Sequence, residues 1–134
     1  MLYLTSIQAL NIEDNTECNG DWHTSSQDWD SLLLADSSKS IFGDWGIESD
    51  KSLPTHKDKF NVANTLRAIL DLMQDKNQLG WLKGFRNDFI GTDIYNEEFF
   101  EKVVLLKDLP HWFDIDKLMK REFMWEWDSF MKRS

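Results

Sequence analysis

The residues with the clearest potential for chemistry lie in a polar segment that ends in a Gly-Asp-Trp-His sequence at His23. A histidine can act as a general base, and a neighbouring serine or carboxylate can complete a catalytic set if the groups converge in space. A small hydrolase or transferase centred on His23, with Asp21, Asp44 or a nearby serine, is therefore the alternative function. No nucleophile motif of the Gly-x-Ser-x-Gly type accompanies it. We therefore favour a structural histidine and assign no catalytic residue.

Metal ligands and phosphate-binding loops are not found at suitable spacings. His23, His56 and His111 are far apart in the sequence, and Cys18 offers only a lone partner for His23. Zinc sites are typically marked by paired cysteines or histidines. The stretch Gly80–Gly84 has two glycines, but its lysine is wrongly placed for a phosphate-binding loop and no strand is expected before it. We expect no metal and no cofactor.

The tripeptide Gly-Asp-Trp occurs twice in the first third of the chain, ending at Trp22 and at Trp45. A tryptophan ring has a large apolar area that is costly to expose, and glycine and aspartate favour turns. We therefore predict that Trp22 and Trp45 are structural and pack this segment onto the helices. Arg67 is predicted to be structural as well, by binding the carboxylate of Asp21 or Asp44 within the fold.

The C-terminal segment 123–131 is richer in apolar side chains than one buried helix face requires. Trp125 and Trp127 are two residues apart, which is about 200° around a helix, so one ring can enter the core while the other points outward. Exposed aromatic and methionine side chains are favoured at interaction surfaces. We assign Trp125 and Trp127 as candidate partner-binding residues, with a tail that covers its own core as the alternative.

The charge composition limits the class of partner. The sequence has 24 acidic and 15 basic residues, a net charge of −9. A negative field repels nucleic acid, so we expect no direct nucleic-acid binding. The same field suits a protein partner that has a basic surface, although it also serves simple solubility.

Location follows from cysteine content and hydrophobic patterning. One cysteine, Cys18, excludes an internal disulfide and favours a reducing, cytoplasmic environment. The residues Met1–Ser6 lack the basic region and long apolar run of a signal peptide. No stretch approaches the roughly 20 apolar residues of a membrane-spanning helix. We expect a cytoplasmic protein without a membrane association.

These residues must be positioned by a single domain of 134 residues, 41% of them hydrophobic. The chain divides near Pro54 into an irregular, Trp-rich segment, 1–54, with at most a small sheet, and a helical part, 55–134. Helical spacing of apolar residues and capping signals predict four helices, at about 58–76, 79–85, 96–106 and 114–133. The expected fold class is mainly α, with α+β as the alternative.

The chain resembles a group of small uncharacterised bacterial proteins that share Gly-Asp-Trp-His and Phe-Gly-Asp-Trp-Gly motifs. The matching segments are Gly20 to His23, Phe42 to Gly46, Arg67 to Leu72 and Leu109 to Trp112. The resemblance implies an antitoxin-like partner of a toxin-like protein, and no catalytic residue is carried over from it. Together with the charge, it leads us to expect a cytosolic, acidic protein-interaction module of antitoxin-like or inhibitor type.

Overall fold

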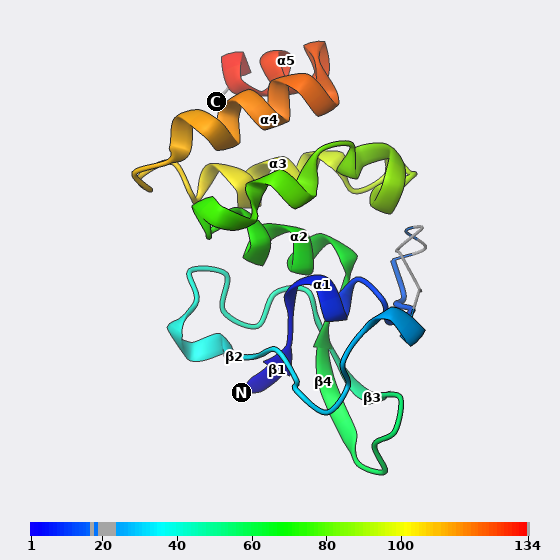
Figure 1. Cartoon of the computed structure of the whole chain (residues 1–134). Coiled ribbons are helices and arrows are strands. Elements are labelled where there is room, and N and C mark those ends of the chain that lie inside the picture. Colours follow the sequence, from blue (N-terminus) through cyan, green and yellow to red (C-terminus); the bar gives the residue numbers. More distant parts are fainter. Residues whose placement is uncertain (17, 19–23, 134) are drawn as a thin grey trace.

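The computed structural model describes residues 1–16, 18 and 24–133 and has an α+β fold, with a mixed sheet at one end and helices stacked above it (Figure 1). The expectation of a mainly α protein is therefore wrong. The elements in chain order are β1 (Leu2–Leu4), α1 (Ser6–Ala9), η1 (Thr24–Ser26), β2 (Leu34–Asp36), η2 (Ser37–Lys39), β3 (Ile47–Ser52), β4 (Lys59–Ala63), α2 (Thr65–Met73), η3 (Lys76–Leu82), η4 (Arg86–Ile90), α3 (Asn96–Val104), α4 (Trp112–Phe123) and α5 (Trp125–Arg133). The η elements are short 3₁₀ helices, except η4, which is a π-helix.

The sheet has four strands in the order β2-β1-β4-β3. β1 pairs antiparallel with β2 and parallel with β4, where Leu4 lies opposite Val62. β3 and β4 form an antiparallel pair with an irregularity between Glu48 and Lys51. β1, β2 and β3 precede Pro54, where at most a small sheet was expected, but β4 follows it, so the part expected to be helical also supplies a strand.

The first predicted helix began too early. The residues from 59 to 63 form β4, and α2 begins only at Thr65. The side chain of Asn64 accepts a hydrogen bond from the backbone N–H of Arg67, which is a typical helix N-cap. Val62 is buried in the strand, so its position in an apolar pattern did not distinguish a strand from a helix.

The helices build the core above the sheet. α2 is buried along almost its whole length and lies between the sheet and α3 (Figure 1). Beyond it, aromatic rings from α3, α4 and α5 pack edge to face: the ring centre of Phe100 is 4.8 Å from that of Phe123 and 5.3 Å from that of Trp127. Such pairs are favoured by the ring quadrupoles.

Two other predicted helices differ from those in the structure. The region around 79–85 is not an α-helix, because the 3₁₀ segment η3 ends at Leu82 and the π-helix η4 follows. The helix expected over 114–133 begins at Trp112 and is divided in two at Met124, whose backbone has φ 51° and ψ −123°. A methionine rarely adopts a positive φ, so this break has no signature in the sequence.

Candidate functional site

The corner between α4 and α5 is the best candidate for an interaction site. Met124 turns the chain there, and the following Trp125 is 73% exposed, while Met124 is 64% exposed. Trp127 is fully buried, and its indole Nε1 donates to Asp116 Oδ1 at 2.9 Å. Of the two tryptophans assigned as partner-binding, Trp125 is placed to contact a partner, and Trp127 belongs to the core.

Polar contacts fix this corner against the preceding segment. The carboxylate of Glu122 accepts hydrogen bonds from the backbone N–H groups of Gly84 and Arg86, both at 3.1 Å. Glu126 forms an ion pair with Arg86 at 2.9 Å and accepts a hydrogen bond from Asn96 at 2.8 Å. Because these groups lie on both sides of Met124, they hold Trp125 on a well-defined backbone.

A second cluster of charged groups is centred on Arg67, which is fully buried. Its Nε lies 3.0 Å from Asp71 Oδ1, and its Nη1 donates to the carbonyl oxygens of Gly43 and Trp45 at 2.7 and 2.5 Å. Arg67 thus ties the front segment to α2 through backbone carbonyls, and no carboxylate among the described residues of that segment binds it. Asp44 instead accepts a hydrogen bond from the Ser37 hydroxyl at 2.5 Å.

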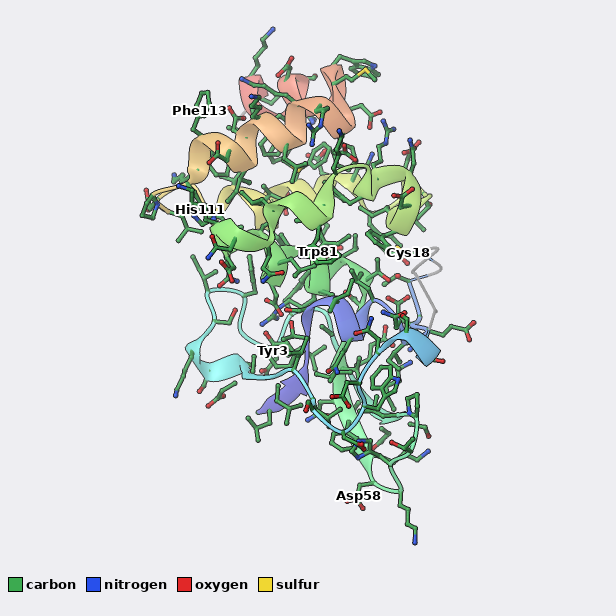
Figure 2. The ribbon with its side chains drawn as sticks, in the orientation of Figure 1. Tyr3, Cys18, Asp58, Trp81, His111 and Phe113 are labelled. Atoms are coloured by element: carbon green, nitrogen blue, oxygen red, sulfur yellow. The ribbon has the colours of Figure 1, made fainter. Side chains whose placement is uncertain are left out.

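Tyr3 completes this buried network from β1 (Figure 2). Its hydroxyl donates to Asp71 Oδ2 at 2.7 Å and accepts from Arg67 Nη2 at 3.0 Å, and the Thr5 hydroxyl also donates to Asp71. Burial, reinforced by the Asp71 carboxylate, raises the pKa of Tyr3 to about 12. The phenol therefore stays protonated near neutral pH and serves as a fixed hydrogen-bond donor.

A cavity of about 510 Å³ adjoins this network, and both Tyr3 and Asp71 contribute to its wall. Its charged wall residues include Asp36, Asp75 and Lys39. Asp36 has its pKa lowered by hydrogen bonds from Ser38, so it is ionised at neutral pH. With Asp71, the wall has three acidic residues against one basic residue, so its field disfavours an anionic ligand.

The Gly-Asp-Trp residues are only partly described. Trp45 is half-buried, its Nε1 donates to Glu98 on α3 at 2.7 Å, and Lys102 lies 5.3 Å from its ring centre. These contacts join the front segment to the helices, as a structural role for Trp45 requires. The predictions for Asp21, Trp22 and His23 fall outside the described residues.

The other histidines and the cysteine have structural surroundings. His56 Nε2 lies 2.6 Å from the Trp29 carbonyl oxygen, and His111 Nε2 lies 2.8 Å from that of Met73. Cys18 is buried, and burial raises the pKa of its thiol. Among the described residues, no three histidine, cysteine or acidic side chains are grouped so that they could hold a metal ion.

The acidic charge and the exposed tryptophan lie in different parts of the molecule. The first 64 residues have eleven acidic and four basic residues, whereas the segment 112–134 has five of each. Figure 2 shows Asp58 at the tip of the β3–β4 turn, at the opposite end from α4 and α5. The largest acidic excess and the exposed Trp125 therefore belong to different segments of the chain.

No family model, curated protein or solved structure matches this chain. The resemblance to the small bacterial proteins therefore stays a prediction. Within residues 1–16, 18 and 24–133, no helix has the length and apolar character needed to cross a membrane.

Proposed function

We propose that this protein works by binding another protein, with Trp125 as the central contact. The observation that carries the proposal is the 73% exposure of Trp125 on a backbone that polar contacts fix from both sides. Tryptophan is enriched among the few residues that dominate interface energetics. A backbone fixed before binding loses little conformational entropy on association, which favours affinity.

The expected binding surface has an apolar centre and a mixed polar rim. Met124 extends the apolar surface beside Trp125, and methionine adapts to irregular partner surfaces. The neighbouring Arg86 and Glu126 pair with each other, so they contribute hydrogen-bonding groups without a strong local field. The partner should therefore offer an apolar pocket at its point of contact with Trp125.

The acidic sheet end has a separate role in this proposal. An excess of seven negative charges in the first 64 residues attracts a basic protein before contact is made. The partner then combines a basic surface with an apolar pocket. By covering that surface and pocket, this protein would act as an antitoxin-like or inhibitor module. The single, buried cysteine supports a cytoplasmic setting for the pair.

Affinity purification from the native host, with mass spectrometry of the co-purifying proteins, tests the proposal. The wild-type protein is compared with Trp125→Ala and with Trp81→Ala, which removes another exposed tryptophan from η3. The partner should be lost with Trp125→Ala and retained with Trp81→Ala, since truncation of a central anchor costs about 2 kcal/mol or more. Equal recovery with both variants, or no specific partner with the wild type, would contradict the proposal.

A further inference from the structure

A cleft of about 320 Å³ lies between η3 and α4. It is lined chiefly by Lys76, Leu79, Asp114, Lys117, Leu118 and Arg121. Figure 2 labels Trp81, near the end of η3, and Phe113, near the start of α4, which are sequence neighbours of the lining residues Gly80 and Asp114. Positions 114, 117, 118 and 121 have the spacing of one helix face, so α4 presents them together.

The cleft has an excess of positive charge. Among the described residues, neither Lys76 nor Lys117 forms an ion pair with an acidic side chain. Arg121 Nε is 3.8 Å from Glu122 Oε2, but the Glu122 oxygens already accept hydrogen bonds from two backbone N–H groups. Asp114 is the acidic residue in the lining, which leaves three cations against one anion.

This local excess contrasts with the rest of the chain. The protein has nine more acidic than basic residues, so its average field does not attract anions. Two cations project from adjacent turns of α4 and one comes from η3 across the cleft, and their fields add within the concave space. The described residues of the cleft therefore form a place where an anion would be stabilised.

We infer that this cleft binds a phosphate monoester. The phosphate group has a charge of about −1.5 to −2 at pH 7, which matches the net excess of the lining. Arginine presents paired N–H donors that fit phosphate oxygens, and lysine adds a point charge. Leu79 and buried Leu118 supply apolar surface against which the organic part of the monoester can lie. The inference is independent of the contact that Trp125 makes with a partner.

Titration of the full chain with phenyl phosphate, followed by amide chemical shifts and calorimetry, tests this inference. We expect a dissociation constant on the order of 1 mM, a typical affinity for a small exposed ligand. Shift changes should concentrate on η3 and on residues 114–121 of α4. Phenyl sulfonate has the same ring but a single negative charge, and it should bind at least about threefold more weakly, because an exposed charge contact contributes modestly.

The variant Lys117→Gln/Arg121→Gln removes two of the three cations, and both side chains are exposed. It should weaken phenyl phosphate binding by about tenfold, taking about threefold for each exposed charge. Lys107→Gln is the control, because Lys107 is also exposed and lies outside the cleft. Thermal melting of each variant checks that the fold is retained.

The outcomes separate clearly. Equal weakening by the control, shift changes spread over all lysines, or binding of phenyl sulfonate as tight as that of phenyl phosphate would overturn the inference.

A phosphotyrosine peptide distinguishes the two sources of a monoester. Tighter binding of the peptide than of phenyl phosphate identifies a phosphorylated protein segment, whereas equal binding identifies a free small molecule.

Discussion

Replacement of Trp127 by alanine should be among the most destabilising changes in the helical half. The side chain is fully buried, packs edge to face on Phe100 and stacks on Phe130, and its Nε1 bonds to Asp116. Loss of a buried tryptophan leaves a cavity and typically costs about 3–5 kcal/mol. With a urea m-value of about 2 kcal/mol/M, the unfolding midpoint should fall by about 2 M.

Two further variants make this prediction specific. Trp127→Phe keeps most of the ring packing but removes the donor to Asp116, so its cost should be about 2 kcal/mol. Trp125→Ala changes an exposed ring two residues away and should cost about 0.5 kcal/mol or less. Urea unfolding of all three, monitored by circular dichroism, gives the order directly. If the Trp125→Ala and Trp127→Ala midpoints coincide, the assignment of one ring to the core and the other to solvent is wrong.

Four other changes test the sheet end. Arg67→Met should cost about 3–5 kcal/mol in urea unfolding, because it leaves Asp71 with an unpaired charge in a buried setting. Gly46→Ala should destabilise by more than about 1 kcal/mol in the same assay, because Gly46 has φ +75° and an added Cβ would lie 2.7 Å from Arg67 Cβ. Trp45→Ala should cost about 2 kcal/mol, since the ring is half-buried, and an unchanged melting temperature would show that it is not structural. For Tyr3, the folded pKa of about 12 exceeds the ordinary value of 10.0, so the free energy of unfolding should fall as pH rises between these values. Tyr3→Phe should remove this pH-dependent contribution. Urea unfolding midpoints measured across the same pH interval check it.

Local sequence signals predicted several helical regions well. The apolar residues Leu66, Ile69, Leu70 and Met73 are all buried on α2, and α3 begins at Asn96, where a helix start was expected. Helical spacing works there because each helix packs one continuous face against the core. The predicted fold class was nevertheless wrong, because β4 was interpreted as part of a helix. β4 is short and is paired on both sides, so it lacks the alternating pattern of a half-exposed strand.

The candidate site was less predictable. The exposure of one tryptophan at the C-terminus followed from spacing, but the choice of Trp125 depended on the break at Met124, which no glycine, proline or asparagine marks. The acceptors that the front segment offers Arg67 at residues 43 and 45 are backbone carbonyls, which any residue supplies, so sequence reasoning sought carboxylates instead. The cleft between η3 and α4 is lined by both Lys76 and Lys117. Because these residues are far apart in the sequence, no local pattern predicts that they share a cleft.

The position of β1 inside the sheet has a consequence for folding. β1 is made of the earliest residues, yet it lies between β2 and β4 and is the strand that links them. The four strands therefore cannot assemble into one sheet until the chain has brought Leu4 beside Val62. This contact joins residues far apart in the sequence, and such contacts slow folding. Removal of the first five residues would separate β2 from the β3–β4 pair and leave β4 with an open edge. Such an edge can pair with another copy of the chain, so shortened forms should aggregate.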